Sequence, residues 1–416
     1  MTDTPTPIHE LARRAKAATS ALAVASTAEK DAALEAAADL LEANAEPIME
    51  ANAVDVASAE ASGMEAPLVD RLRLDTGRIG SMAGGLRQVA ALRDPVGEIT
   101  EGWVRPNGLR IEKTRVPLGV VAIIYESRPN VTSDAFGLCL KSGKVAFLRG
   151  SSSAINSNLA IAGVLRDALP KAGLPSDALV MVDDTRREAA TEFMQQRGFV
   201  DCLIPRGGPS LIQSILENAT VPYVIDGAGN CHIYVDAAAD LDMAREITHN
   251  AKTQRIGVCN AAESLVVHTD VASAFLPMVA AALDGVELVG DERARAIVSM
   301  GEATETDFAT EYLDMKMSVK VVDDLDAAIE HVNATSTGHS EAIITNDVGA
   351  ADRFAREVDA AAVLVNASTR FVDGEEFGFG AEIGISTQKL HARGPMGLEQ
   401  LTTEKFVVRG SGQVRG

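Results

Sequence analysis

Residues 120–131 read Val-Val-Ala-Ile-Ile-Tyr-Glu-Ser-Arg-Pro-Asn-Val, an unbroken apolar run followed by a polar turn. A short run that is apolar on both faces is typical of a strand in a parallel sheet that helices cover on both sides. Similar runs recur, with helical stretches between most of them. We predict strands of this first series at 120–124, 145–148, 179–182, 202–204, 223–225 and 233–235.

A second series of the same kind follows, and we predict its strands at 265–267, 286–289, 319–322, 342–344 and 362–365. Strands that alternate with helices predict the α/β class. Two such series predict two α/β domains, and Cys259 falls near the start of the second. We therefore expect a cofactor domain and a catalytic domain.

Two other segments differ from this pattern. Residues 8 to about 92 carry apolar residues at helical spacing, and Ser26 with Glu29 forms a capping box that opens a helix. Pro106-Asn107-Gly108 is a turn signal between two strand-like arms, so residues 102–116 predict a hairpin. We expect this hairpin to leave its domain and meet another subunit of a homo-oligomer.

Length and composition limit the function classes. A chain of 416 residues is long enough for two or three domains, and its net charge of -21 argues against general nucleic-acid or anionic-membrane binding. The four cysteines are widely spaced, which disfavours a zinc site or a disulfide framework. Residues Met1 to Glu10 lack the pattern of a signal peptide. We expect a soluble cytoplasmic protein without a metal.

The strongest candidate for chemistry is Cys259, in the stretch 250–260, Asn-Ala-Lys-Thr-Gln-Arg-Ile-Gly-Val-Cys-Asn. A thiol attacks as the thiolate, which nearby cations such as Lys252 and Arg255 favour. Gly257 allows a substrate to approach the backbone closely. From this stretch alone an inert core cysteine is the commoner outcome, so the choice depends on the rest of the chain.

Polar residues follow two predicted strands, at the edge of a parallel sheet where ligands bind. Asn130 carries an amide suited to a developing oxyanion, although an ordinary turn or cap asparagine is the commoner reading. Arg149 and Ser152 follow the strand at 145–148, where no acidic residue stands. An arginine with hydroxyls suits the 2′-phosphate of NADP, and the alternative is a solvated polar loop.

Arg206, Gly207 and Gly208 follow the strand at 202–204 and precede a helix. Glycines beside a helix N-terminus make a phosphate-binding corner, and the alternative is a plain strand-to-helix turn. The dinucleotide fingerprint Gly-x-Gly-x-x-Gly is absent from the sequence. His331 and His339 have no partner at metal spacing, so we interpret them as structural.

Together these segments resemble the gamma-glutamyl phosphate reductase family of the aldehyde dehydrogenase superfamily. The resemblance runs from about residue 8 to about residue 408. It rests on Tyr-Glu-Ser-Arg-Pro-Asn-Val-Thr at 125–132, Leu-Arg-Gly at 148–150, Gly-Asn-Cys-His-Ile-Tyr-Val-Asp at 229–236, Gly-Val-Cys-Asn at 257–260, Val-Asn-Ala-Ser-Thr-Arg-Phe at 365–371, and the segment 380–395.

The resemblance implies an aldehyde dehydrogenase-like α/β fold, with two Rossmann-like domains and a small β oligomerisation arm. The superfamily binds its dinucleotide without the glycine fingerprint, which fits its absence here. The implied ranges are 1–101 and 118–231 for the NADP-binding domain, 232–384 for the catalytic domain, 102–117 and 402–416 for the arm, and 385–401 for a return to the cofactor domain.

The resemblance also implies residue roles. Cys259 is the nucleophile, and the Asn130 amide with the Cys259 backbone N–H forms the oxyanion hole. The implied contacts with NADP are Arg149 and Ser152 near the adenosine ribose, Arg206, Gly207 and Gly208 at the pyrophosphate, and Glu311 on the nicotinamide ribose.

The implied activity is NADPH-dependent reduction of L-glutamyl 5-phosphate to L-glutamate 5-semialdehyde and phosphate, in proline biosynthesis. The reaction runs through a thioacyl intermediate on Cys259. The anionic substrate needs cationic partners, for which Arg128, Lys252 and Arg255 are candidates.

One departure separates the chain from hydrolytic aldehyde dehydrogenases, which carry a water-activating glutamate in a Glu-Leu-Gly-Gly-Lys segment. The matching run here is Asp-Gly-Ala-Gly-Asn at 226–230, so the acid is the shorter Asp226. This difference disfavours a first rival, a hydrolytic NAD(P)-dependent aldehyde dehydrogenase. The intact cysteine, asparagine and cofactor corner disfavour a second rival, a non-catalytic metabolite-binding relative.

Overall fold

The structure is a computed structural model that describes residues 5–225 and 227–415. Its contacts divide the chain into two compact units. Unit 1 comprises Met1–Ile225, Phe379–Gly384 and Met396–Gly416, and unit 2 comprises Asp226–Gly378 and Ile385–Pro395.

These bounds differ from the expected domain ranges where the chain passes between units. Strand β7 (Cys231–Val235) belongs to the sheet of unit 2, so the chain enters this unit before residue 231. The segment Ile385–Pro395 groups with unit 2 instead of returning to the cofactor domain. Ion pairs from Lys389 and Arg393 to Asp359 hold it there.

Unit 1 begins with the helical region that the sequence predicts. The predicted capping box opens its second helix, because the Ser26 hydroxyl accepts from the Glu29 N–H and the Glu29 carboxylate accepts from the Ser26 N–H. The helices are α1 (Ile8–Leu22), α2 (Thr27–Ala43), α3 (Ala45–Ala61), α4 (Ala66–Leu72) and α5 (Thr76–Ala91).

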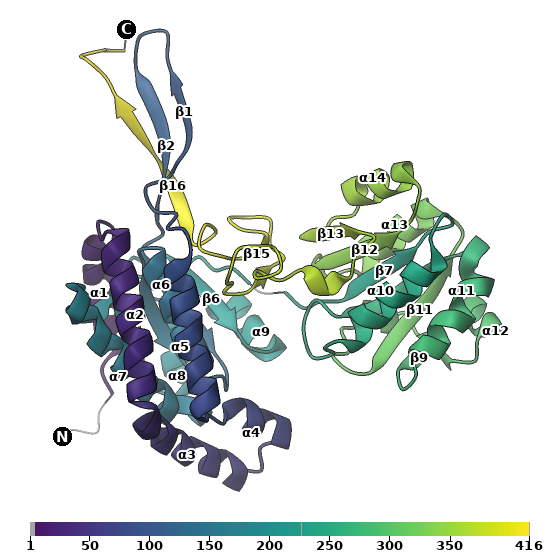
Figure 1. The fold of residues 1–416 in the computed structure, drawn as a ribbon, viewed down its shortest axis with the longest axis horizontal. Coiled ribbons are helices and arrows are strands. Elements are labelled where there is room, and N and C mark those ends of the chain that lie inside the picture. The colour runs from purple at the N-terminus through teal and green to yellow at the C-terminus, as the bar shows by residue number, and fades with distance from the viewer. Residues whose placement is uncertain (1–4, 226, 416) are drawn as a thin grey trace. The chain divides into compact units, whose positions relative to one another are not determined.

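The described part of unit 1 contains a four-stranded parallel sheet in the order β5-β4-β3-β6. The strands are β3 (Val120–Tyr125), β4 (Val145–Arg149), β5 (Leu179–Met181) and β6 (Cys202–Arg206). The connecting helices are α6 (Asn130–Lys141), α7 (Ile155–Ala168) and α8 (Arg187–Phe193), and α9 (Pro209–Asn218) follows β6. Helices α6 and α7 contact the strands, and α2 and α5 pack outside them (Figure 1).

The expected strand at 223–225 is reduced to a single bridge between Leu203 and Tyr223. Pro222 precedes the bridge and has no N–H to donate, so pairing cannot extend past it in that direction. The other five expected strands of the first series are present, with bounds that differ by one to two residues.

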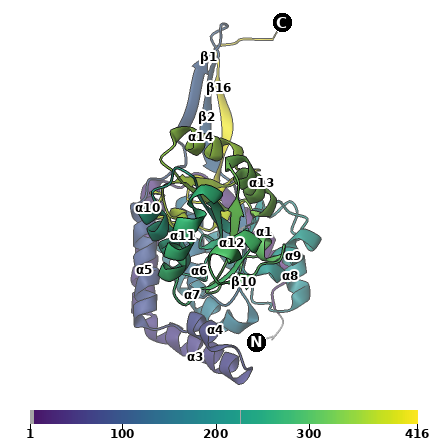
Figure 2. The same cartoon turned by 90° about the vertical axis from the view of Figure 1, so that its right-hand side faces the viewer.

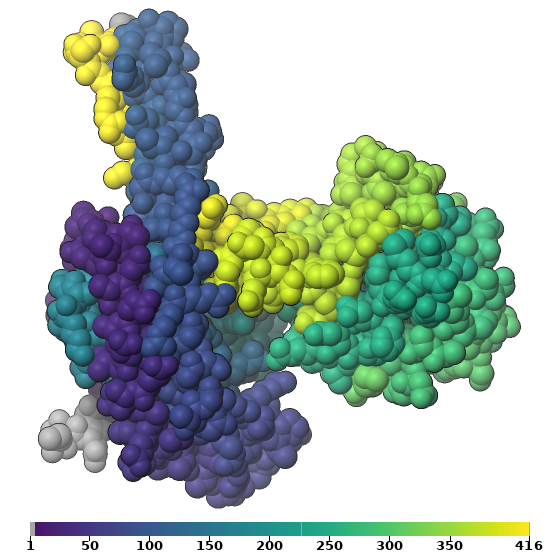
Figure 3. All heavy atoms as spheres, viewed as in Figure 1, coloured from purple at the N-terminus to yellow at the C-terminus, as the bar shows by residue number. Residues whose placement is uncertain are grey.

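The predicted hairpin forms one edge of a separate three-stranded antiparallel sheet. Strands β1 (Ile99–Val104) and β2 (Arg110–Pro117) pair with each other, and β16 (Thr402–Arg409) pairs with β2 along its whole length. Gly108 has φ +86°, the left-handed conformation that the turn requires. Figures 2 and 3 show this sheet projecting from the helical body of unit 1. We call these three strands the arm.

Unit 2 contains a parallel sheet, seven strands in its described residues, in the order β10-β9-β11-β8-β7-β12-β13. Besides β7, its strands are β8 (Ala262–His268), β9 (Glu287–Gly290), β10 (Gly301–Glu302), β11 (Lys316–Val322), β12 (Ser340–Ile344) and β13 (Ala362–Val365). A short ladder of β14 (Ile385–Ser386) and β15 (Gly394–Pro395) lies apart from this sheet.

Alternate residues of these strands enter two different cores. Ile233 and Val235 pack with helices α10 (Leu241–Thr253) and α11 (Thr269–Ala282), whereas Tyr234 between them packs with α13 (Leu325–Thr335) and α14 (Val348–Glu357). The short helix α12 (Glu292–Ile297) adds Ala294 to the first core. This period of two, with both faces covered, explains why the strands are continuously apolar.

Candidate active site

Cys259 lies in the turn between α10 and β8, at the amino end of the parallel sheet of unit 2. It is half-buried, whereas the other three cysteines are buried. Burial raises the pKa of the Cys139 and Cys202 thiols to about 12, and it raises the pKa of the Cys231 thiol as well. Only the position of Cys259 therefore combines access with a loop setting.

Gly229 places the chain directly beneath this turn. A Cβ atom at residue 229 would lie 1.5 Å from the carbonyl oxygen of Cys259, so no other residue fits without moving the turn. The Gly229 N–H donates to the Glu311 carboxylate at 2.7 Å. The segment before β7, the turn before β8 and the loop at Glu311 thus meet around the candidate nucleophile.

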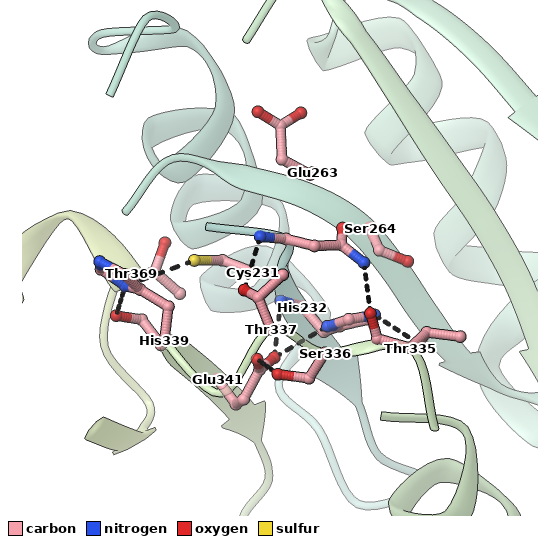
Figure 4. Close-up of polar contacts among 12 residues, drawn as sticks. Cys231, His232, Glu263, Ser264, Thr335, Ser336, Thr337, His339, Glu341 and Thr369 are labelled. Carbon is pink, nitrogen blue, oxygen red and sulfur yellow. Dashed lines mark hydrogen bonds and ion pairs between the residues drawn. The ribbon is translucent and has the colours of Figure 1, made fainter. Parts of the chain in front are cut away.

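Cys231 adds a second contact to the same carbonyl. Its thiol donates to the Cys259 carbonyl oxygen at a sulfur–oxygen distance of 3.2 Å, and its sulfur lies 3.9 Å from Nδ1 of His339. Burial lowers the pKa of His339 to about 4, so this ring is neutral at pH 7. Figure 4 shows Cys231 between this histidine and the neighbouring polar contacts.

A buried network of hydrogen bonds around His232 connects strands β7 and β12. The His232 ring lies between the Glu341 carboxylate and the Thr335 hydroxyl, each at 2.9 Å, and the Glu341 carboxylate also accepts from the His232 backbone N–H (Figure 4). Ser336 donates to the other oxygen of Glu341. Both ring nitrogens of His232 and both carboxylate oxygens of Glu341 have hydrogen-bond partners. These bonds hold the amino ends of β7 and β12 together.

The turn is also bonded on its far side, to the segment after β13. The Asn260 side chain donates to the Val372 carbonyl at 2.9 Å, and the Thr369 hydroxyl donates to the Asn260 carbonyl at 2.7 Å. Both side chains are buried. The segment around residues 369–372 is therefore held in a fixed position relative to Cys259.

In unit 1, Arg149 and Arg206 lie at the carboxyl ends of strands β4 and β6, which both pair with β3. Ile124 of β3 pairs with Arg149 of β4, and Tyr125 pairs with Arg206 of β6, so three strand ends lie side by side. The chain crosses from β5 to β6 past β3, which makes the β3–β6 edge a topological switch point where α/β proteins bind ligands.

Arg149 is largely buried at this edge. One terminal nitrogen donates to the Arg186 carbonyl at 2.9 Å, and its buried Nε has no protein partner among the described residues. Burial lowers the pKa of Arg149, and the nearby Asp184 carboxylate opposes this shift. Ser152 is exposed at the start of a 3-10 turn, Ser152–Ala154.

The glycine corner follows β6 as expected. A Cβ at residue 207 would lie 2.7 Å from the Glu126 carboxyl carbon, and the Gly208 N–H at the start of α9 donates to Glu126 at 3.0 Å. A carboxylate thus accepts from the amide that we expected to face a phosphate. An incoming phosphate would share or replace this contact.

Asn130 is the first residue of α6 and is exposed. One N–H of its amide donates to the Asp134 carboxylate at 2.9 Å, which fixes the orientation of the amide plane.

Comparison with known proteins agrees with this architecture. The model of the aldehyde dehydrogenase family matches residues 2–315 and 317–407. The chain belongs to the aldehyde dehydrogenase family. The fold expected from the sequence is therefore confirmed, and family membership makes the chain an oxidoreductase.

Several similar proteins that match over nearly the whole chain are named gamma-glutamyl phosphate reductase. A gamma-glutamyl phosphate reductase of Caldanaerobacter subterraneus subsp. tengcongensis is 55% identical over 97% of this chain and 98% of its own length. One from Thermobifida fusca is 54% identical over 100% of both chains. The crystal structure of the Thermotoga maritima gamma-glutamyl phosphate reductase superposes with a TM-score of 0.98, at 49% identity, over 99% of this chain and 100% of that chain.

The three basic residues predicted to bind the substrate, Arg128, Lys252 and Arg255, differ in how exposed they are. Arg255 is exposed in the turn before Cys259, and Arg128 is exposed in the loop between β3 and α6. Lys252 is fully buried, with its ammonium 2.6 Å from the equally buried Glu263 carboxylate. A buried lysine paired in this way anchors α10 to β8, because removing either charge would leave the other uncompensated.

Two further features concern the histidines and the membrane. Burial lowers the pKa of His331 to about 3, and among the described residues no group of three or more His, Cys, Asp or Glu could hold a metal ion. Within the same residues no helix is long and apolar enough to cross a membrane.

Sequence reasoning missed two residues near Cys259. Cys231 lies in the segment 229–236, on which the family resemblance rests. Its contact with Cys259 joins residues 28 positions apart, so no local sequence pattern indicates it. Arg370 stands in another recognised segment, and its proximity to the cysteine follows from hydrogen bonds of the turn to residues 369 and 372. A basic residue inside a recognised segment was the only available clue.

We predict that Cys231→Ala lowers kcat about three- to tenfold with little change in KM for the substrate or in affinity for the nicotinamide cofactor. The change removes one weak hydrogen bond to the Cys259 carbonyl, and such a bond contributes about 0.5–1.5 kcal/mol. Cys231→Ser keeps a donor and is expected to recover most of the rate. Equal rates for the alanine variant and the wild type, measured at the same folded fraction, would show that the bond does not position the nucleophile.

Proposed function

We propose that the chain reduces L-glutamyl 5-phosphate to L-glutamate 5-semialdehyde and phosphate, with NADPH as the cofactor, in proline biosynthesis. The proposal rests on full-length similarity to proteins named gamma-glutamyl phosphate reductase. The structural observation that carries it is the setting of Cys259, a half-buried thiol in a turn held by Gly229, Cys231 and Asn260.

In the proposed mechanism the Cys259 thiolate attacks the acyl carbon, the bond from this carbon to the phosphate oxygen breaks, and a thioester remains on the enzyme. The Asn130 amide and the Cys259 backbone N–H donate to the oxyanion that forms in this step. Arg255 and Arg128 are proposed to attract the anionic substrate. Lys252 is left out of the substrate contacts because its charge is buried against Glu263.

The residues of unit 1 fit a phosphorylated dinucleotide. Arg149 has a buried Nε without a protein partner in the described residues, and a Cβ at Gly207 would fill the corner beside α9. We propose that Arg149 and Ser152 hold the adenosine ribose with its 2′-phosphate, that Arg206, Gly207 and Gly208 hold the pyrophosphate, and that Glu311 binds the nicotinamide ribose. Bound NADPH would supply the hydride that reduces the thioester.

We also propose that the arm joins copies of the chain and that the enzyme works in the cytoplasm. On the arm, the rings of Trp103 and Phe406 pack edge to face, with their centroids 6.3 Å apart. Both side chains remain exposed, as do Val104 and Val408. Apolar side chains on an exposed sheet support a protein contact. The four free cysteines support a reducing compartment.

The hydrolytic rival depends on a base that activates water. The residue at the matching position, Asp226, lies outside the described residues. Water needs a positioned base before it can attack the acyl group, and the side chain of Asp226 is shorter than the glutamate of hydrolytic relatives. Phosphate is already an anionic nucleophile and needs no such base, which supports phosphate as the partner of the acyl group.

We predict that Cys259→Ala lowers turnover of glutamate 5-semialdehyde with NADP⁺ and phosphate by more than about a hundredfold, since no other group replaces a covalent nucleophile. Cys139→Ala, in a buried thiol of unit 1, serves as the matched control and is expected to stay within about threefold of wild type. Thermal unfolding and NADPH titration report whether each variant is folded. A Cys259→Ala variant with more than about a hundredth of wild-type activity would exclude the thioacyl route.

For the cofactor, we predict that Arg149→Gln weakens NADPH binding at least about tenfold more than NADH binding, because the variant loses a charged contact with the 2′-phosphate. Glutamine keeps an amide that can donate to the Arg186 carbonyl. Arg187→Gln, on the exposed first turn of α8, controls for a general loss of positive charge. Equal losses for both cofactors in fluorescence titrations would place the 2′-phosphate elsewhere.

A further inference from the structure

A cavity of about 290 Å³ opens in unit 2 beside the segment that is bonded to the cysteine turn. Its walls come from the last turns of α10 and from the residues after β13. The polar residues of its lining are Asn250, Gln254, Arg370, Asp373, Glu375 and Glu376. This volume lies just below the usual range for small-molecule sites, about 300–1,000 Å³, and suits a small group.

Hydrogen bonds link the wall of the cavity to the turn that carries the candidate nucleophile. Thr369 and Val372, which flank Arg370 and Phe371, are the two residues that bond to Asn260, the neighbour of Cys259. Burial lowers the pKa of Arg370, and a thiolate at Cys259 would act in the opposite direction. A ligand in the cavity would therefore have a fixed position relative to the reacting sulfur.

Arg370 is the cation of this cavity. Its Nε donates to the Gln254 side-chain oxygen at 2.8 Å, which orients the guanidinium plane. Burial lowers the pKa of Arg370, and neighbouring Arg255 adds to this shift, whereas Asp373 opposes it. A half-buried, oriented guanidinium is suited to two parallel hydrogen bonds with a carboxylate.

Three carboxylates share the lining with this one arginine. Asp373 is half-buried, and its Oδ1 accepts from the Glu375 N–H at 2.9 Å, while Glu375 and Glu376 are exposed. Such a lining repels a phosphate dianion and attracts an ammonium group. A cation next to several anions is complementary to a ligand that itself carries both charges.

We infer that this cavity binds the α-carboxylate and α-ammonium of the substrate, with Arg370 on the carboxylate and Asp373 on the ammonium. The inference rests on the proposed function, and it names the part of the site that selects an amino-acid substrate. An aldehyde that lacks either charged group leaves a polar partner unpaired in the cavity, which is the stronger form of substrate discrimination.

The test combines two variants with three aldehydes, measured as KM and kcat with NADP⁺ and phosphate. Glutamate 5-semialdehyde carries both groups, 5-oxopentanoate lacks the ammonium, and 4-aminobutanal lacks the carboxylate. We expect Arg370→Gln to raise KM at least about tenfold for the first two and to leave 4-aminobutanal nearly unchanged. We expect Asp373→Asn to raise KM for glutamate 5-semialdehyde and 4-aminobutanal and to leave 5-oxopentanoate nearly unchanged.

Arg356→Gln, at the exposed end of α14, is the matched control for loss of one positive charge. Thermal unfolding and NADPH affinity separate binding defects from misfolding. If Arg370→Gln instead raised KM for phosphate and weakened all three aldehydes equally, the cavity would hold the phosphate group and the inference would be overturned. Absence of wild-type turnover with glutamate 5-semialdehyde would overturn the proposed function itself, together with this inference.

Discussion

The contact between Gly229 and the Cys259 carbonyl is the constraint on which the candidate site of unit 2 depends. The two backbone segments approach so closely that a Cβ at residue 229 would overlap the carbonyl oxygen. The same glycine donates its N–H to Glu311, and Cys231, two residues on, donates its thiol to the same carbonyl. The position of the candidate nucleophile is therefore set by the chain entering β7, and not only by its own loop.

Buried polar pairs hold the strands that make this approach possible. Lys252 at the end of α10 pairs with Glu263 on β8, and His232 on β7 pairs with Glu341 on β12. Burial raises the pKa of Glu263, whereas the lysine charge lowers it. The Lys252–Glu263 pair contributes little net stability, but removing either partner would leave the other buried without its partner. The same holds for the hydrogen bond between His232 and Glu341, because a buried polar group that loses its partner is costly. They lie close to the amino ends of the strands, where Cys259 also lies.

The sequence predicted much of the fold, because strands buried on both faces leave continuous apolar runs. It predicted the α/β class, the arm hairpin and the capping box at Ser26. It did not predict strand order, since β3 pairs with β4 and β6 through crossovers that leave no local pattern. The runs also cannot show where the chain leaves one unit. The resemblance assigned 385–401 to the cofactor domain, whereas Ile385–Pro395 groups with unit 2.

The candidate site was predictable only in part. Cys259, Asn130 and Arg149 stand directly after or before apolar runs, where position on a sheet edge can be inferred. In the sequence, Lys252 and Arg255 look alike, because both are basic residues shortly before Cys259. The partner of Lys252, Glu263, lies on the following strand, so only the structure shows that this lysine is buried. Arg370 joins the site through bonds between residues more than 100 positions apart.

We propose that the acyl group on Cys259 is exchanged with phosphate and not with water. The most direct measurement is NADPH absorbance after glutamate 5-semialdehyde and NADP⁺ are mixed with the enzyme in phosphate-free buffer, followed by addition of phosphate. We expect at most one NADPH per active site before phosphate is added, and steady turnover afterwards. Sustained turnover at an undiminished rate without phosphate would contradict it and would identify water as the acceptor.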